Sequence, residues 1–407
     1  MLDSLALALA RCKNKRSLQR IELQYMKYDD ENYMRLFASL TEFSNVLEIC
    51  IDGSDIGPLG VIGLAKVLQS PASKIHTLKL MVDAFDGMFM PDLINALIRN
   101  NSVKSLDLRK NREVGAQAWG IFSAVLFHPL CTIEKLCLSG ADIENNGVTY
   151  LGEALGFNKS LTHLDLSYNN AITYEGWEGF LKCMRNPDLA LKELVLGYCW
   201  IDGDEAGLIM RSLRGNTSFT RLDMRGNKNV LSAGLVAIFY ALLGGGQFLE
   251  ELDLRDNVDT LNEEHWLVLS RALCDKSSID STYFDSNHIL HTIEFDYSNS
   301  LWLTIMGIDN DEGVDVDLSF HTIWNDIQSS LDMNRGENTD DVIRRKILKH
   351  HFTGEASDVQ VFARMPETLL PNAIEWIGRS RDARTYSIMF NVVQGMPALM
   401  REATTDS

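Results

Sequence analysis

The sequence lacks the features that would place the chain in a membrane or hold it together with disulfides. None of its apolar runs approaches the roughly 18 residues that a transmembrane helix requires. Its seven cysteines are an odd number and include no C-x-x-C pair, so we expect free thiols and a reducing compartment. The N-terminal run MLDSLALALARCKNKR has its acidic residue first and its basic residues last, which is the wrong charge order for a secretory signal. We therefore expect a cytoplasmic protein, with the nucleus as the second possibility.

Signals for catalysis, cofactors and metals are equally scarce. The chain has no G-x-x-x-x-G-K loop for phosphate, no H-E-x-x-H helix and no Cys/His cluster. The acidic run DNDEGVDVDL from Asp309 places Gly313 one residue too early for a calcium-binding EF-hand loop, although weak calcium binding there stays open. The net charge of -18 disfavours nucleic-acid binding, which depends on neutralising phosphates with Lys and Arg. We expect no enzyme, no cofactor, no metal site and no nucleic-acid or membrane partner.

The feature that the chain does have is a repeat of 28 to 30 residues, present ten times. Each copy follows the pattern L-x-x-L-x-L-x-x-N, with other apolar residues allowed at the leucine positions, as in VKSLDLRKN and LEELDLRDN. A fixed period of this length is typical of a solenoid, in which repeats stack on their neighbours around one elongated core. The ten copies start at Leu18, Val46, Ile75, Val103, Ile133, Leu161, Leu191, Phe219, Leu249 and Ile279.

The positions within one repeat have different expected roles. Apolar residues at the first, fourth and sixth positions alternate with mostly polar residues at the third, fifth and seventh, which predicts a short strand with one exposed face. The asparagine at the ninth position suits a buried amide that bonds backbone groups of the turn. About ten residues of helical spacing follow, and we expect Trp119, Trp177 and Trp266 to lie in the core on these helices.

Two kinds of repeat alternate, since the starts at Val103, Leu161 and Phe219 are 58 residues apart. One kind has a longer turn after its asparagine, as in NREV, and the other has a shorter turn, as in GADI. This alternation of two units, each with a full helix, resembles the ribonuclease-inhibitor-type leucine-rich repeats. The resemblance implies an α/β horseshoe with a concave parallel sheet and convex helices, whose members bind proteins through the concave face.

The two ends of the chain depart from the repeat. We expect residues 1–17 to form a capping helix or partial repeat, residues 18–290 the ten repeats, residues 291–335 an acidic irregular connector, and residues 336–407 a helical region. The chain opens within a repeat, which leaves a missing N-terminal part as an alternative. The segments SLDMNR, RRKILKHHF and AIEWIG resemble the helical tail of leucine-rich repeat proteins of diatoms, which implies an architecture but no activity.

Three N-x-S sequences, at Asn100, Asn158 and Asn216, match the acceptor for N-glycosylation. They recur because the turn before each strand favours Asn and Ser. We therefore interpret them as part of the repeat rather than as modification sites.

The exposed strand face is the candidate binding site, and two interpretations of its charges stay open. Asp107/Arg109, Asp223/Arg225 and Asp253/Arg255 place opposite charges on this face. Under the first interpretation these pairs neutralise each other across adjacent strands, each contributing roughly 0 to 1 kcal/mol. Under the second, Arg225 and Arg255 bind a partner's carboxylates while Asp165, Asp223 and Asp253 bind its basic groups.

Aromatic residues add to this face. Tyr168, Tyr198 and Trp200 come from consecutive repeats at or just after the strand end, so we expect them near one rim of the sheet. Tyrosine, tryptophan and arginine dominate interface hot spots. The predicted site therefore combines these three aromatics with Arg225, Arg255, Asp165, Asp223 and Asp253.

The sequence thus predicts a non-enzymatic scaffold that binds a protein partner on the concave face and its rim. A GTPase-activating protein of the Ran type is one alternative, because that family has the same repeats and acidic regions; a GTP hydrolysis assay separates it from a scaffold. A ligand-sensing module of a larger receptor is the other, and coding sequence upstream of Met1 would favour it.

Overall fold

The computed structural model describes residues 2–257, except for short gaps at 13, 15–16, 27–28, 55, 83–86, 187, 215, 217 and 244–248, and also residues 292–294. The chain divides into two compact units, and nearly all described residues belong to the first, which comprises Met1–Ile238, Gln247–Thr260 and Glu294–Asn299. The predicted repeat start at Ile279, the helical region 336–407 and, apart from residues 292–294, the acidic connector 291–335 lie outside the described residues.

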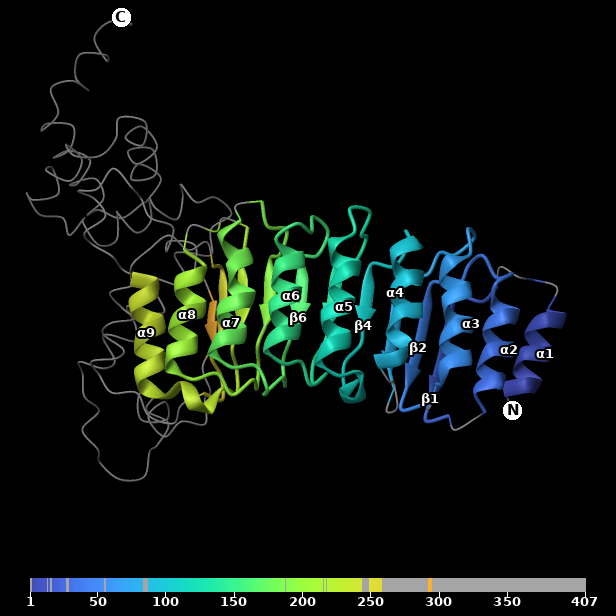
Figure 1. Cartoon of the computed structure of the whole chain (residues 1–407), viewed down its shortest axis with the longest axis horizontal. Coiled ribbons are helices and arrows are strands. Elements are labelled where there is room, and N and C mark those ends of the chain that lie inside the picture. The colour runs from blue at the N-terminus through green and yellow to red at the C-terminus, as the bar shows by residue number, and fades with distance from the viewer. Residues whose placement is uncertain are drawn as a thin grey trace, which may run out of the picture. The chain divides into compact units, whose positions relative to one another are not determined.

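One parallel sheet runs through the repeats in the order of the sequence (Figure 1). Each strand from β1 to β8 pairs in parallel with the next one along the chain, and β10 (Thr292–Glu294) is last in the sheet order. Strands β1 to β9 lie where the third to fifth or third to seventh position of a repeat was predicted, whereas β10 falls within the predicted acidic connector. The strands are β1 (Arg20–Gln24), β2 (Glu48–Asp52), β3 (Thr77–Met81), β4 (Ser105–Asp107), β5 (Lys135–Cys137), β6 (His163–Asp165), β7 (Glu193–Val195), β8 (Arg221–Asp223) and β9 (Glu251–Asp253).

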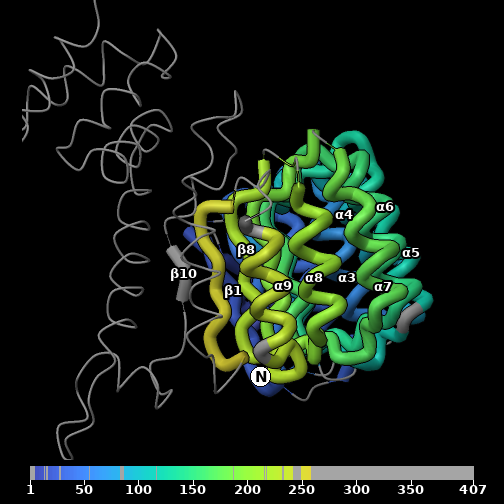
Figure 2. The backbone as a smooth tube through the Cα atoms, turned by 90° about the vertical axis from the view of Figure 1, so that its left-hand side faces the viewer, coloured from blue at the N-terminus to red at the C-terminus, as the bar shows by residue number. Residues whose placement is uncertain are grey.

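The helices form a second layer on one face of this sheet, as the end-on view in Figure 2 shows. In α4 the buried residues Met90, Leu93, Ile94 and Leu97 recur at helical spacing, which places one apolar stripe against the sheet. The helices are α1 (Leu2–Arg11), α2 (Asp30–Leu40), α3 (Pro58–Gln69), α4 (Met90–Arg99), α5 (Ala116–Phe127), α6 (Asn145–Leu155), α7 (Tyr174–Phe180), α8 (Gly203–Ser212) and α9 (Leu231–Leu243), with 3-10 turns η1 (Gly87–Phe89), η2 (Arg112–Val114), η3 (Leu181–Arg185) and η4 (Lys228–Val230).

The ninth-position asparagines are buried, as predicted. Asn169 is 0% exposed, and its Nδ2 donates to the carbonyls of Leu138 at 2.9 Å and Leu166 at 2.8 Å. Its Oδ1 accepts from the backbone N–H of Ala141 at 3.2 Å and Ile143 at 3.0 Å. One side chain therefore satisfies backbone groups in two successive repeats, and Asn111 and Asn227 make the same kind of contacts.

The asparagines of the N-x-S sequences form a second buried row. Asn158 is 5% exposed; its Nδ2 donates to the carbonyl of Leu126 and its Oδ1 accepts from the backbone of Ser160 and Leu161. Asn100 and Asn216 do the same in their repeats. Because these amides are buried and bonded to the backbone of two repeats, they support the interpretation of the motif as part of the repeat.

The core contains the largest apolar side chains of the helices. Trp119 and Trp177 are both 0% exposed, as expected, whereas Trp266 lies outside the described residues. These observations confirm an α/β leucine-rich repeat solenoid. Among the residues that the structure describes, no helix has the length and apolar character needed to span a bilayer.

Candidate protein-binding surface

The face of the sheet turned away from the helices carries a network of charges. At the third position, Arg20 Nη1 lies 3.3 Å from Glu48 Oε2, and Arg221 Nε lies 3.0 Å from Glu251 Oε2, in each case on the neighbouring strand. His163 Nδ1 and Glu193 Oε2 form a similar pair across β6 and β7 at 2.8 Å. Parallel pairing in register brings these side chains opposite each other.

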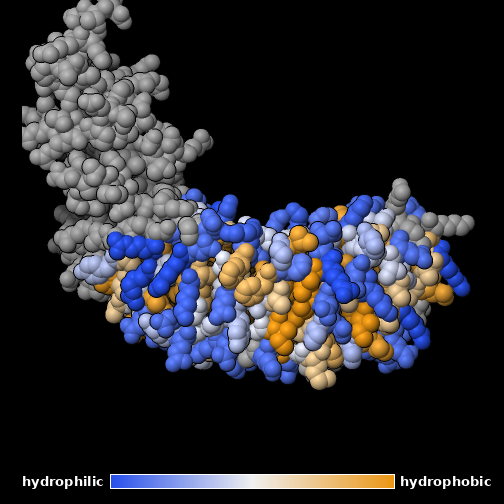
Figure 3. All heavy atoms as spheres, turned by 45° about the horizontal axis from the view of Figure 1, so that its top comes forward, coloured by the Kyte–Doolittle hydropathy of each residue, from blue (hydrophilic) through white to orange (hydrophobic). Residues whose placement is uncertain are grey.

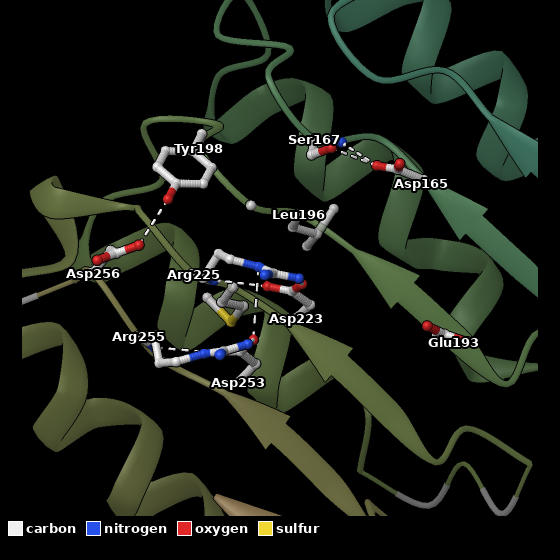
Figure 4. Close-up of polar contacts among 12 residues, drawn as sticks. Asp165, Ser167, Glu193, Leu196, Tyr198, Asp223, Arg225, Asp253, Arg255 and Asp256 are labelled. Carbon is white, nitrogen blue, oxygen red and sulfur yellow. Dashed lines mark hydrogen bonds and ion pairs between the residues drawn. The ribbon is translucent and has the colours of Figure 1, made fainter. Parts of the chain in front are cut away.

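The fifth and seventh positions hold the Asp/Arg pairs, and they pair mainly within one repeat rather than between neighbouring repeats. Arg255 Nε lies 3.0 Å from Asp253 Oδ1 and its Nη2 lies 2.6 Å from Asp253 Oδ2, a two-point fork. Arg225 binds Asp223 through Nε and Nη2, and its Nε also lies 3.6 Å from Asp253 Oδ2 on the next strand (Figure 4). The pKa of the Arg225 guanidinium is raised above its ordinary value, and the main cause is its hydrogen bonding to Asp223. Both guanidinium groups are therefore already bound to carboxylates of the chain itself.

Three fifth-position residues that the repeat pattern placed on the exposed face are in fact buried. Cys50 is 4% exposed, Asp107 4% and Cys137 5%. The two thiols are short and lie in register between longer neighbours on both sides, such as Glu22 and Lys79 around Cys50. Asp107 is covered because Arg109 binds both of its carboxylate oxygens.

The rim at the carboxyl ends of the strands exposes large apolar side chains from adjacent repeats. We define the rim cluster as Tyr168, Tyr198, Trp200 and Leu231. Tyr168 is 54% exposed, Trp200 64% and Leu231 62%. The rings of Tyr168 and Tyr198 stack with centroids 4.8 Å apart and planes 9° apart, so the structure brings together the two predicted tyrosines.

All four members of the rim cluster have a left-handed backbone. Their φ angles are 60° for Tyr168, 56° for Tyr198, 61° for Trp200 and 51° for Leu231. For a bulky L-residue this conformation costs roughly 1 to 3 kcal/mol, because Cβ crowds the following carbonyl. The fold thus keeps three large apolar residues, Tyr168, Trp200 and Leu231, at places where they are both strained and exposed, and Tyr198 at a strained, half-buried place.

Some equivalent places in other repeats carry residues that suit this backbone, although Tyr25 (φ 52°) and Lys110 (φ 64°) also occupy the eighth place in their repeats. The counterpart of Trp200 is Asp142, with φ 55°, and the counterpart of Leu231 is Gly115, with φ 75°. The counterparts of the two tyrosines include Gly140 and Gly226. The repeat itself therefore does not require tyrosine, tryptophan or leucine at these places.

Tyr198 also links its repeat to one two repeats further on. Its ring lies over Gly226, where an added Cβ would come within 2.3 Å of the ring carbons. Its hydroxyl donates to Asp256 Oδ2 at 2.7 Å (Figure 4). The pKa of the Tyr198 phenol is raised to about 12, and this hydrogen bond is the main cause.

Sequence reasoning missed Leu231, Gly226 and Asp256 as parts of this surface. Listing the eighth residue of every repeat would have found the last two, since Tyr25, Tyr168, Tyr198, Gly226 and Asp256 all occupy it. Leu231 gave no such signal, because its exposure depends on where α9 begins. For metal binding, the described residues hold no group of three or more His, Cys, Asp or Glu side chains suited to a cation.

A second apolar area lies on the helix side. Phe127 is 43% exposed, Leu130 72% and Phe157 70%, at the edge where the helices end and the strands begin. The rings of Phe127 and Phe157 are 5.5 Å apart. Figure 3, with the upper edge of Figure 1 turned forward, shows apolar side chains as separate patches among hydrophilic ones. This area has ordinary backbone angles, so it provides a matched comparison for the rim cluster.

Comparison with known proteins supports the repeat type. A family model described as leucine-rich repeat matches residues 157–181. The human protein named NACHT, LRR and PYD domains-containing protein 14 is 32% identical over 212 residues, which is 52% of this chain and 19% of that protein. Mouse ribonuclease inhibitor is 25% identical over 210 residues, covering 52% of this chain and 46% of the inhibitor. The chain therefore carries leucine-rich repeats of the ribonuclease-inhibitor type and spans at most about half of these relatives.

Among solved structures, the leucine-rich repeat-containing protein LegL7 from Legionella pneumophila aligns with a TM-score of 0.47 and 15% identity, over 78% of this chain and 92% of that one.

Proposed function

We propose that this leucine-rich repeat protein is a non-enzymatic scaffold that binds a partner protein on the exposed sheet face and the adjoining rim cluster. The observation that carries the proposal is the left-handed backbone at Tyr168, Tyr198, Trp200 and Leu231, three of which are exposed while Tyr198 is half-buried. Sparsely populated backbone angles cluster where a protein uses the side chains that they present. Within the described repeats, the equivalent places show that unstrained choices are available.

The chemistry of the rim cluster supports a protein partner. Aromatic side chains bury a large area at low entropic cost and are the commonest interface hot spots. Beside them, Arg225, Arg255, Asp223 and Asp253 form a rigid, pre-paired charged surface that suits a polar interface margin. Asp165 lies on the same face and supplies a further carboxylate. The relative named ribonuclease inhibitor acts on a protein, which agrees with this proposal.

We also place the protein in the cytoplasm. Six described cysteines are free, among them the buried Cys50, Cys137, Cys183 and Cys199. Free thiols persist in reducing compartments.

Affinity capture from the native cell tests the proposal with the whole chain as bait. The test variant is Tyr198→Ala with Trp200→Ala, and the control is Phe157→Ser, which removes from the opposite edge an aromatic about as exposed as Trp200. We expect the double variant to lose at least one partner that the parent chain and the control both retain. Equal recovery by all three baits would refute the assignment of the site.

A second candidate function is a ligand-sensing repeat module within a larger protein. The similarity to a relative that carries NACHT and PYD domains besides its repeats favours it. A transcript with coding sequence upstream of Met1 would support this function, and a stop codon directly upstream in frame would exclude it.

A further inference from the structure

Asp165 differs from the other aspartates at the fifth position of the strands. Asp107, Asp223 and Asp253 are each followed two residues later by an arginine that binds the carboxylate at two points. Asp165 is followed by Ser167 instead. Its Oδ1 accepts from the Ser167 backbone N–H at 3.0 Å and from the Ser167 hydroxyl at 2.5 Å.

No basic side chain of the described repeats forms a direct ion pair with Asp165, and Arg109 acts on it only through longer-range Coulomb attraction. Its neighbours in register, Cys137 on β5 and Val195 on β7, are uncharged. The nearest arginines along the seventh position are two strands away, Arg109 bound to Asp107 and Arg225 bound to Asp223. Asp165 is half-buried, so its charge is costly to leave without a counter-ion once a partner removes the water.

The seventh position beside Asp165 is occupied differently on its two sides. On the β5 side it is Ser139, a short side chain. On the β7 side it is Gly197, where an added Cβ would lie 3.2 Å from Arg225 Cγ, so the stem of Arg225 borders the site there. The ring of Tyr168 stands at the rim of the same repeat, stacked on Tyr198 on one side. At the same place in the preceding repeat, Gly140 has no side chain to cover the other side.

We propose that an arginine side chain of the partner protein occupies this place. Its guanidinium binds Asp165 by the same two-point fork that the chain makes with its own arginines, and its plane packs against the Tyr168 ring. Arginine fits better than lysine because the planar fork matches a carboxylate and stacks on aromatic faces. This inference rests on the proposed function, since it assigns the chemistry of one contact on the same surface.

A fluorescent, end-blocked peptide of alternating glycine and arginine tests the inference by anisotropy titration of the full chain. The same peptide with citrulline, a neutral isostere of arginine, is the ligand control. We expect Asp165→Asn to weaken binding of the arginine peptide at least about tenfold, equivalent to about 1.4 kcal/mol. The citrulline peptide should bind weakly and equally to both proteins.

Two further variants separate a built site from general electrostatics. Ser167→Arg copies the pattern of the other repeats, so the new arginine should form an ion pair with Asp165. It should weaken binding of the arginine peptide as much as Asp165→Asn does. Asp52→Asn removes a carboxylate at the seventh position of β2 on the same face and should change affinity less than about twofold. Equal effects of Asp52→Asn and Asp165→Asn, or equal binding of the citrulline peptide, would overturn the inference.

The same variants distinguish this inference from the proposed function. If Asp165→Asn leaves the peptide affinity unchanged while the Tyr198→Ala, Trp200→Ala chain still loses its cellular partner, the arginine contact is wrong and the binding surface stands.

Discussion

At the scale of single residues, the repeats separate what the fold needs from what it tolerates. Asn169 and its counterparts satisfy several buried backbone groups of two successive repeats, so the fold depends on them. The fold does not depend on Trp200 and Leu231 in this way, because the backbone at these two places would accommodate Asp or Gly more readily. Replacing one of the buried asparagines should therefore lower the stability of the protein. Replacing Trp200 or Leu231 should lower only its affinity for a partner.

Replacing Asn169 with Ala should destabilise the repeat unit by about 3 kcal/mol or more, because several buried backbone groups lose their partner at roughly 1–3 kcal/mol each. Native-state hydrogen exchange should show lost protection at the amides of Ala141 and Ile143, which donate to the asparagine. Asn145→Ala is the control, since its bonds to Thr173 are exposed. A loss of protection no greater than the control's would contradict the assigned role.

Replacing Trp200 with Asn should leave the thermal midpoint unchanged or raise it. The corresponding gain in unfolding free energy is up to about 1 kcal/mol, because asparagine tolerates the left-handed backbone. The same change should lower affinity for a captured partner by about 2 kcal/mol or more, the loss typical of a hot spot. Calorimetry and a binding titration measure the two effects. A marked fall in the midpoint would show that the indole packs for stability instead.

At the scale of elements, the left-handed turn that follows strands β1, β2 and β4 to β9 is the feature that the pattern of apolar residues could not reveal. The strands, the helices and the buried asparagines follow from side-chain chemistry that recurs at fixed positions, so the sequence predicted them. The exposure of Trp200 and Leu231 depends on backbone angles, and those become known only when the turn is built. The pairing of Arg225 with Asp223 was likewise open, since spacing alone does not decide between the same strand and the next.

The hydroxyl of Tyr198 joins the turns of β7 and β9, and its titration reports on this link. Asp256→Asn removes the charged acceptor, so the pKa of the Tyr198 phenol should fall from about 12 toward its ordinary value of 10.0. Absorbance titration of phenolate, compared with a Tyr198→Phe chain to identify the signal, measures the change. An unchanged titration would mean that the link between Tyr198 and Asp256 does not form in solution.

At the scale of the whole repeat unit, buried thiols should set an upper pH limit for stability. Burial raises the pKa of Cys137 to about 11 and those of Cys183 and Cys199 to about 12, from an ordinary value of 9.0. Below pH 9 the thiols are protonated in both folded and unfolded chains. Above it the unfolded chain loses protons that the folded chain keeps, so stability should fall as the pH rises toward 11 and 12.

The contribution of one thiol can be isolated from the slope of the unfolding free energy against pH, rather than from the unfolding free energy at a single pH. Under reducing conditions, the unfolding free energy of the parent chain should fall with pH between about pH 10 and 11. The fall should be smaller in Cys199→Ala, by about 1.4 kcal/mol per pH unit. Parallel denaturation curves at several pH values give this slope. A slope equal to that of the parent chain would show that Cys199 ionises in the folded state as it does in the unfolded one.

The central claim is that the rim cluster contacts a partner protein, and site-specific photo-crosslinking in the native cell tests it most directly. The photoreactive amino acid p-benzoyl-phenylalanine would replace Trp200 in one chain and Phe157 in another, two aromatic positions of similar exposure on opposite edges of the repeats. We predict a discrete crosslinked protein from position 200 that is absent from position 157. Crosslinks from position 157 alone, or the same products from both positions, would contradict the claim.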